Sequence, residues 1–569
     1  MVTSGITVVN KMAKLSSDEL ALFPLKNIDS VVKLFKIHIE KNHEPNLAIL
    51  SIILGYIENT LTCSRVAESS DSVPHVTACD KEVHWQENNS TKIPAVEYTF
   101  VEALYQRFLS IIKAHVDVAS FGNPKYASRE LVKRVSDVVW CTLSSSYYKD
   151  RAHLQSIYSY MTGAKLDSSG TTLAVVAACQ ALGYNDVHLA LSEDHTWVVC
   201  GANQQTSVEV TWHGKGNEDK RGIPVTFNVY DKSWLYVNGR PVICDRYMEV
   251  ASMISSMNPG ISASTDSEEV LILQQALLWL MYDANHIAKY PMAIANLGDL
   301  EETAPSLGRP SPISLYQEAI VSNVTHYSNH HVYPYTCLAG YCYRNALYKQ
   351  ALQAWAKAAA VIKHYNYSRD DEEIYKEFLD IANELIPHIM RVVSSGIEAH
   401  SILKDPECFA LLLQFYDGIC LWEEGSATPV LHIGWAKCLV NTMAKFDAEV
   451  RSRLKITCGH DDSGDENGTD DEEHCKGRRH SPAHPQQDQN GNTQSGLAVA
   501  PHVELNSAKM RGLRHLLLAD KLNSQAVSLQ LTAQSQVKVR QKRSSAAATS
   551  QGPAELENSS NRPKRGRRD

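Results

Sequence analysis

The spacing of apolar residues predicts a chain that is mainly helical. Apolar positions recur every three or four residues, which places them on one face of a helix. Residues 67–94 lose this periodicity and are polar, so we expect a loop there. The predicted helices cover residues 27–39, 47–61, 96–116, 268–282, 290–300, 314–325, 333–345, 348–364, 371–386, 408–422 and 430–445.

Residues 171–236 have a different pattern, which predicts one buried helix followed by a small sheet. Residues 171–182 are almost wholly apolar, with helix-capping residues before them and Gly183 as a stop. The runs that follow are rich in β-branched and aromatic residues and alternate in polarity. We expect strands at residues 187–191, 197–200 and 207–212, with residues 224–229 and 233–236 completing the sheet.

Composition and charge narrow the class of protein. A chain of 569 residues, 44% hydrophobic and 21% charged, is typical of a globular protein with several domains. The 13 cysteines lack framework spacing, which indicates free thiols in a reducing compartment. We find neither a signal peptide nor a membrane-spanning run, so no membrane association is expected.

The net charge of −9 hides an uneven distribution. Residues 460–496 are acidic and polar, and they predict a disordered linker. Within them, residues 463–474 depart from a calcium-binding loop at the first and last ligand positions, so no metal or cofactor is expected. The basic clusters at 538–543 and 562–568 are typical of nuclear import or DNA contact. Their candidate residues are Lys542, Arg543, Lys564, Arg565, Arg567 and Arg568.

The order helix, strand, strand resembles the cysteine–histidine–aspartate core of transglutaminase-like and papain-like folds. His195 and Glu209 take the histidine and acid positions, but Ser168, Ser169 or Gly170 stands where the nucleophilic cysteine belongs. We therefore expect a catalytically silent core with no catalytic residues, and Cys179 as a core residue. The alternative is a serine-dependent acyl-transfer enzyme that uses Ser168 or Ser169.

An acidic stripe marks the predicted helix 371–386. Glu373, Glu377, Asp380 and Glu384 fall on one helical face, and Ile374, Phe378, Ile381 and Leu385 on the adjoining one. The stripe fits either a solvated surface or a groove for an arginine-bearing peptide. Aromatic anchors for such a groove would be Tyr290, Tyr333, Tyr335 and Trp355.

Two further patterns concern helix packing. Small and aromatic residues over 338–355 resemble a tetratricopeptide repeat, although an ordinary helical bundle remains an alternative. Near the C-terminus, Asn506-Ser507 is expected to cap a basic amphipathic helix that buries Met510, Leu513 and Leu517. Residues 527–531 and 537–539 alternate like strands, and we expect this segment to dock on the main body.

Several motifs together resemble the menin family of nuclear scaffold proteins and tumour suppressors. The most specific is EVTWHGKGNED at residues 209–219. The others are ELVKRVSDV at 130–138, KDRAH at 149–153, KLDSSG at 165–170, LALSEDH at 189–195, DEEIYKEF at 371–378 and LQLTAQSQV at 529–537. The acidic linker does not match the family.

The resemblance implies a series of domains. They are an N-terminal helical domain at 1–115, a silent transglutaminase-like domain at 116–244 and a tetratricopeptide-like helical palm at 245–400. A C-terminal helical region follows at 401–459, then the disordered acidic linker at 460–500, a helix with strands docking on the body at 501–540, and a basic tail at 541–569.

The resemblance also implies a function. Menin proteins receive the N-terminal peptide of mixed-lineage-leukaemia type histone lysine methyltransferases, or a peptide of the JunD transcription factor, in a central pocket. The methyltransferase complex recruits the lens-epithelium-derived growth factor, and the scaffold regulates transcription through chromatin in the nucleus. A non-specific DNA-binding protein acting through the basic tail remains an alternative, and weak DNA contact is compatible with the scaffold.

The implied pocket lies between the second and third domains. Serines replace the mammalian Phe, Cys and Ala in segment 251–256, and Cys337 replaces a Tyr. We expect these changes to make the pocket roomier and more polar, and the peptide to bind more weakly. The implied peptide-binding residues are Ser192, Asp194, His195, Ser252, Ser255, Ser256, Tyr290, Met292, Asn296, Tyr333, Cys337, Trp355, Glu373, Glu377 and Asp380.

Overall fold

The computed structural model places most of the chain in two compact units, residues Met1–Phe378 and Leu379–Asp569. The predicted linker, the strand expected at 537–539 and both basic clusters lie outside the described residues. The described residues are 15–62, 91–122, 125–144, 153–211, 219–260, 267–368, 372–395, 402–425, 434–458, 500–519, 523, 525–527 and 529–530.

Helices form most of the N-terminal part of the first unit. They are α1 Ser17–Leu20, α2 Ile28–Lys41, α3 Leu47–Thr62 and α4 Tyr98–His115, followed by the 3₁₀ turn η1 Val118–Phe121, α5 Arg129–Thr142 and α6 Ile157–Gly163. The periodicity predicts three of them, α2, α3 and α4. Asn27 begins α2, because its side chain accepts a hydrogen bond from the Ser30 amide at 2.9 Å.

Part of the expected loop at 67–94 is a strand, so that prediction was wrong at its C-terminal end. β2 Lys92–Val96 pairs antiparallel with β1 Leu25–Asn27. Only two of its side chains, Ile93 and Val96, are buried, and they are three residues apart. Such a short strand has no alternating signal, and its partner lies far away in the sequence.

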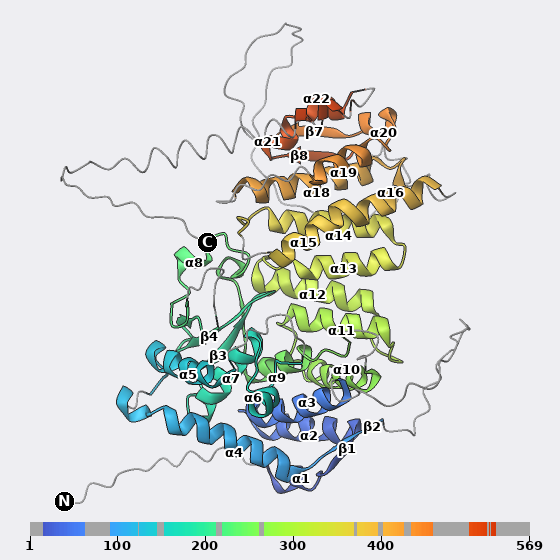
Figure 1. The fold of residues 1–569 in the computed structure, drawn as a ribbon. Helices are drawn as coiled ribbons and strands as arrows, with labels where there is room; N and C mark the ends of the chain where they lie inside the picture. Colours follow the sequence, from blue (N-terminus) through green and yellow to red (C-terminus); the bar gives the residue numbers. More distant parts are fainter. Residues whose placement is uncertain are drawn as a thin grey trace, which may run out of the picture. The chain divides into compact units, whose positions relative to one another are not determined.

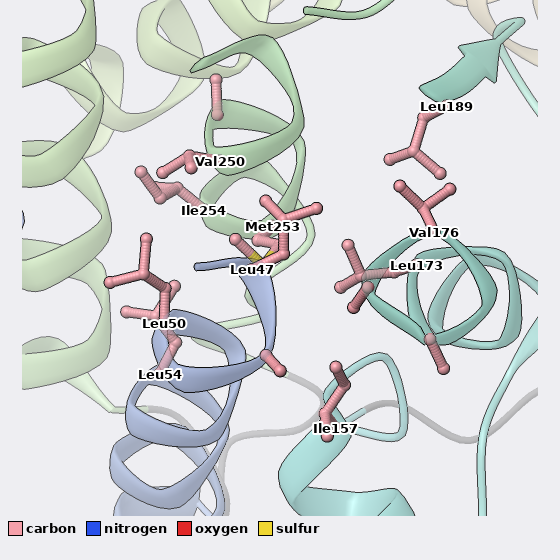
Figure 2. Packing of buried hydrophobic residues seen from close by; sticks show 14 of the residues in the cluster. Leu47, Leu50, Leu54, Ile157, Leu173, Val176, Leu189, Val250, Met253 and Ile254 are labelled. Carbon is pink, nitrogen blue, oxygen red and sulfur yellow. The ribbon is translucent and has the colours of Figure 1, made fainter. Parts of the chain in front are cut away.

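A long buried helix, α7 Ser168–Ala181, lies in the middle of the first unit (Figure 1). Asp167 caps it, and the φ of +94° at Gly183 ends it as expected. Every residue from Gly170 to Cys179 is buried. Figure 2 shows the surrounding core, to which α3, α6, α7, β3 and α9 contribute Leu47, Leu50, Leu54, Ile157, Leu173, Val176, Leu189, Val250, Met253 and Ile254.

Four strands form an antiparallel sheet beside α7, in the order β5-β4-β3-β6. β3 His188–Leu191 and β4 Thr196–Cys200 match the prediction, whereas β5 Thr206–Val208 is shorter than expected. The fourth strand is β6 Val242–Ile243, which the sequence analysis missed because two residues carry no periodicity.

The strands expected at 224–229 and 233–236 were wrong. The first region contains the helical turn α8 Phe227–Tyr230, and the second leads into the 3₁₀ turn η2 Val237–Gly239. Phe227 is 61% exposed, so its alternation with polar neighbours does not reflect a buried strand face. Trp234, Leu235 and Tyr236 are all buried although they are consecutive, which a strand with one solvated face does not allow.

The rest of the first unit is a series of helices in which each packs on the next from α11 to α14 (Figure 1). Small residues bring neighbours close; a Cβ on Gly298 of α11 would lie 3.0 Å from the ring of Tyr316 on α12. The bounds are α9 Arg246–Ser255, α10 Glu268–Asp283, α11 Pro291–Thr303, α12 Pro312–Tyr327, α13 Tyr333–Arg344 and α14 Tyr348–Ile362. All but α9 correspond to predicted helices.

The helix predicted at 371–386 is interrupted by a π turn. α15 Glu372–Asp380 leads into η3 Ile381–Leu385, and α16 Ile386–Ser395 follows. A π turn adds a residue to the helical repeat, so the acidic stripe does not continue as one regular face into Glu384. Ile374, Phe378 and Ile381 are buried as expected, whereas Leu385 is only partly buried.

The second unit continues with α18 Pro406–Gly425, α19 Gly434–Met443 and α20 Ala448–Ser452. β7 Lys455–Cys458 pairs in parallel with β8 His502–Leu505, from beyond the predicted linker. The expected amphipathic helix is split into α21 Ala508–Arg511 and α22 Arg514–Leu517. The strand expected at 527–531 was wrong, because residues 525–527 are helical.

Buried polar contacts hold residues 500–519 in the second unit. Both oxygens of Asp417 on α18 accept the Asn506 amide, and one of them also accepts the Ser507 amide. Met510, Leu513 and Leu517 are fully buried, as predicted. In the described part of the chain, no helix is long and apolar enough to cross a membrane.

Candidate functional site

His195 is held at the end of the β3–β4 turn by a network of buried polar groups. Its Nε2 lies 2.9 Å from Glu209 Oε1, and the Tyr236 hydroxyl donates to the same oxygen at 2.6 Å. The imidazole stacks on Trp197 with ring centroids 5.7 Å apart, and Tyr236 meets it edge-on. The Ser192 hydroxyl accepts the His195 amide at 3.0 Å, which closes the turn. The ring is therefore fixed in position.

The start of α7 lies where the resemblance to a transglutaminase-like core expects a nucleophilic cysteine. Ser168 and Ser169 are exposed, whereas His195 is buried. A Cβ on Gly170 would lie 2.8 Å from backbone atoms of Gln155, so a larger side chain does not fit there. The acid–histidine pair is present and buried, whereas the two serines are exposed.

Cys179 is a core residue, as the sequence predicted. Its side chain is fully buried in α7, and burial raises the pKa of its thiol well above the usual range. A thiol that stays protonated at neutral pH is a poor nucleophile.

The turn between β3 and β4 contacts the first residue of α13. The Tyr333 hydroxyl donates to Asp194 Oδ2 at 3.0 Å, and its ring meets Trp234 edge-on with centroids 5.6 Å apart. Burial and then the charges of Asp194, Glu377 and Glu193 raise the pKa of Tyr333. The phenol therefore stays protonated and lies among carboxylates.

Cys337 lies one helical turn after Tyr333 and is partly buried. Burial raises the pKa of its thiol well above the usual value, and the charges of Asp299, Glu377 and Glu193 add to the effect. We call the set formed by Glu193, Asp194, Tyr333, Cys337 and Glu377 the Tyr333 cluster. Its members come from the β3–β4 turn, α13 and α15.

The two acidic residues of α15 in the first unit differ in their surroundings. Glu377 is partly buried and acts electrostatically on Tyr333 and Cys337. Glu373 is exposed and pairs with Lys376 at 3.0 Å. Asp380 is exposed and belongs to the second unit.

The candidate residues of α9 and α11 line up along packed helices. Tyr290, just before α11, is buried, and burial raises the pKa of its phenol; Ser252 forms a side-chain hydrogen bond with it. Ser255 Oγ and Asn296 Oδ1 are buried without a hydrogen-bond partner among the described residues. Met292 is partly buried, and Ser256 is exposed, with its hydroxyl bonded to the Met253 carbonyl at 2.9 Å.

Two predicted aromatic anchors are core residues. Trp355 is 1% exposed and packs on Tyr343, with ring centroids 6.0 Å apart. Tyr335 is buried, and its hydroxyl binds Asn329 at 2.8 Å.

Sequence reasoning missed one member of the cluster, Glu193, and the residues that contact it. Glu193 accepts the Trp234 indole N–H at 2.8 Å and the Tyr333 amide at 2.5 Å, and His331 lies beside it. The available signal was Glu193 itself, a carboxylate in a turn between two buried strands. The described residues contain no group of three or more His, Cys, Asp or Glu side chains able to hold a metal.

The chain was compared with protein families and solved structures. The family model described as Menin matches residues 15–499 and 463–560. These ranges include the acidic linker, so the expectation that the linker does not match the family was wrong. A crystal structure of menin, which reveals the binding site for the Mixed Lineage Leukemia (MLL) protein, is 46% identical in sequence with a TM-score of 0.71. The match covers 90% of this chain and 99% of that one. Both the family match and this identity over nearly the full length place the chain in the menin family.

Proposed function

We propose that the protein is a scaffold that binds short peptides at the Tyr333 cluster and carries out no covalent chemistry. The observation that carries the proposal is the position of Tyr333, which donates to Asp194 and lies within the field of Glu377. An aromatic ring beside carboxylates is suited to a peptide that carries apolar anchors and an arginine. Asp194 is exposed and so is open to such a peptide.

In this proposal, His195 is a wall of the site and not a base. Its Nε2 is taken up by Glu209, and its ring lies against Trp197 and Tyr236. The serines at the start of α7 are exposed whereas His195 is buried, so the geometry does not favour acyl transfer. Ser192, Ser252, Ser255, Ser256, Tyr290, Met292 and Asn296 are proposed to complete the peptide-binding surface.

The proposed partner is the N-terminal peptide of a mixed-lineage-leukaemia type histone lysine methyltransferase. Support comes from the menin structure that reveals an MLL binding site, at 46% identity. A JunD-like peptide would use the same site, and the lens-epithelium-derived growth factor would join through the methyltransferase. We propose that the protein acts in the nucleus on transcription through chromatin, with basic clusters that direct import and add weak DNA contact.

A calorimetric titration of the full chain with a short peptide carrying Phe, Pro and Arg tests the proposal. The matched control is a peptide of the same composition in scrambled order. We expect saturable one-to-one binding of the first and none of the second. Equal binding of both peptides would reduce the interaction to non-specific charge attraction, and no binding of either would refute the proposal.

A further inference from the structure

One buried side chain closes the junction between the β3–β4 turn and α13. The Glu193 carboxylate is fully shielded from solvent. It accepts the Trp234 indole N–H and the backbone N–H groups of Val332 and Tyr333, at the N-terminus of α13. Its neighbour Asp194 and the side chain of Tyr333 belong to the proposed peptide site. Glu193 therefore holds together two elements that present the site.

His331 faces Glu193 from the residues just before α13. Its side chain is 1% exposed, and its Nδ1 lies 4.0 Å from Glu193 Oε1. The other ring nitrogen, Nε2, is 3.3 Å from the backbone oxygen of Arg240. A carbonyl oxygen only accepts hydrogen bonds, so Nε2 must carry the hydrogen. Nδ1 has no hydrogen-bond partner among the described residues.

These positions conflict unless an additional proton is present. A neutral His331 with its hydrogen on Nε2 has a lone pair on Nδ1, 4.0 Å from Glu193 Oε1, and an ionised Glu193 places a negative oxygen at that distance. Both groups are buried, so water does not screen the repulsion. One proton on either Glu193 Oε1 or His331 Nδ1 removes it and leaves the pair with no net charge.

The surroundings determine which of the two groups holds the proton. Burial raises the pKa of Glu193 to about 8, and the charge of Asp194 adds to this rise. The three hydrogen-bond donors act in the opposite direction and lower this pKa. Burial also lowers the pKa of His331 to about 4, and the charge of His330 lowers it further. The hydrogen bond to the Arg240 backbone raises this pKa and so acts in the opposite direction. Tyr365 and the Cys337 thiol also interact electrostatically with Glu193, and Tyr327 meets the His331 ring edge-on. At neutral pH the proton therefore stays on Glu193.

We infer that Glu193 is a positioning residue of the peptide site, which holds the β3–β4 turn against α13 as long as the Glu193 carboxyl keeps its proton. This inference rests on the proposed function. When the proton leaves for solvent in alkaline solution, a buried carboxylate remains beside Asp194 and the His331 lone pair. The contact between the turn and α13 then weakens, and with it the alignment of Asp194 and Tyr333.

The test compares peptide affinity near pH 7 and pH 9 in wild type and Glu193→Gln. About one molecule in ten keeps the proton one pH unit above a pKa of about 8, so wild type should lose about tenfold in affinity. The amide of Glu193→Gln does not titrate, so its affinity should change little with pH. It should be weaker than wild type near pH 7, because an amide nitrogen cannot accept from Trp234. Glu268→Gln, at an exposed position in α10, should follow wild type.

Parallel pH profiles for wild type and Glu193→Gln would overturn the inference. If wild type binds no peptide, the proposed function fails. Thermal unfolding then still tests whether the proton on Glu193 holds the β3–β4 turn against α13. The melting temperature of wild type should then fall more between pH 7 and 9 than that of Glu193→Gln, and equal falls would overturn it. If the variant does not fold, imidazole ¹⁵N shifts of wild-type His331 decide: a hydrogen on Nδ1 with a bare Nε2 would contradict the assignment.

Discussion

The hydroxyl of Tyr333 donates to Asp194 Oδ2 at 3.0 Å, and this contact joins two elements that are 139 residues apart in the sequence. Asp194 belongs to the turn that also carries His195, and Tyr333 is the first residue of α13. The contact therefore aligns a turn of the small sheet with the helices that follow it. In the proposed function, the peptide meets both elements, so their alignment affects its affinity.

Tyr333→Phe removes this hydrogen bond and keeps the ring on Trp234. A hydrogen bond to a charged group contributes about 1.5–3 kcal/mol when buried, and Asp194 is exposed, so we expect a loss near 1 kcal/mol, about fivefold in peptide affinity. Calorimetric titration measures it. The matched control is Tyr335→Phe, which removes the hydrogen bond to Asn329 away from the cluster. Equal affinities for the two variants would contradict the role of Tyr333.

Ser252→Phe restores the aromatic residue that the family resemblance places at this position. An added aromatic contact with the peptide contributes about 0.5–1.5 kcal/mol beyond its buried area, so we expect tighter binding. Loss of the Ser252–Tyr290 hydrogen bond offsets part of the gain. Ser110→Ala serves as the control, because that exposed hydroxyl bonds to the Gln106 carbonyl within α4 and lies outside the proposed peptide-binding surface. An unchanged or lower affinity for Ser252→Phe would show that serine does not limit binding.

Gly170→Ala should destabilise the first unit. The new methyl group would lie 2.8 Å from the Gln155 backbone, and such overpacking costs about 1–3 kcal/mol. Gly163→Ala is the control, since the nearest atoms there are 3.9 Å away. Differential scanning calorimetry compares the two melting temperatures. Similar values would mean that the start of α7 has room for a side chain, and the silent core would need another explanation.

The second unit should depend on the buried pair between Lys509 and Glu423. Their charged atoms lie 2.8 Å apart, and the two side chains are 7% and 4% exposed. Lys509→Met takes the ammonium group away from the buried Glu423 carboxylate, and breaking a buried ion pair in this way costs about 3–5 kcal/mol. Urea unfolding measures the loss, and Lys509→Met combined with Glu423→Leu should regain part of it.

A surface ion pair of the second unit provides the control for that experiment. Arg453 and Glu449 are more than half exposed, and such pairs contribute about 0–1 kcal/mol. Arg453→Met should therefore change the free energy of unfolding little. If Arg453→Met lowers the free energy of unfolding as much as Lys509→Met does, burial does not decide how much an ion pair contributes to stability.

Much of the fold could be predicted because its signals are local. α7 has a capping aspartate, an unbroken apolar run and a terminal glycine, and all three lie within residues 167–183. The helices from α10 to α14 each bury one face against a neighbour, so helical spacing marks them. β6 has only two residues and β2 buries only two, so neither shows a pattern.

The site could be predicted only in part, because it depends on contacts that the sequence does not show. Glu193 meets Tyr333 across 140 residues, and no local pattern predicts that a carboxylate in this turn is buried. Trp355 looked like an anchor, since aromatic residues are suited to both pockets and cores, and the structure places it in the core. The sequence pattern likewise gave Glu373 and Glu377 the same role in the acidic stripe. The structure separates them, because Glu377 is partly buried and Glu373 is exposed.

That difference gives the most direct test of peptide binding at the Tyr333 cluster. Wild type, Glu377→Gln and Glu373→Gln are titrated calorimetrically with the peptide carrying Phe, Pro and Arg. Glu377 is partly buried and acts on Tyr333, so its neutralisation should cost about 1.5–3 kcal/mol, roughly tenfold or more in affinity. Glu373 is exposed and paired with Lys376, so its loss should cost less than about 1 kcal/mol. Equal losses, or a larger loss for Glu373→Gln, would contradict binding at the cluster.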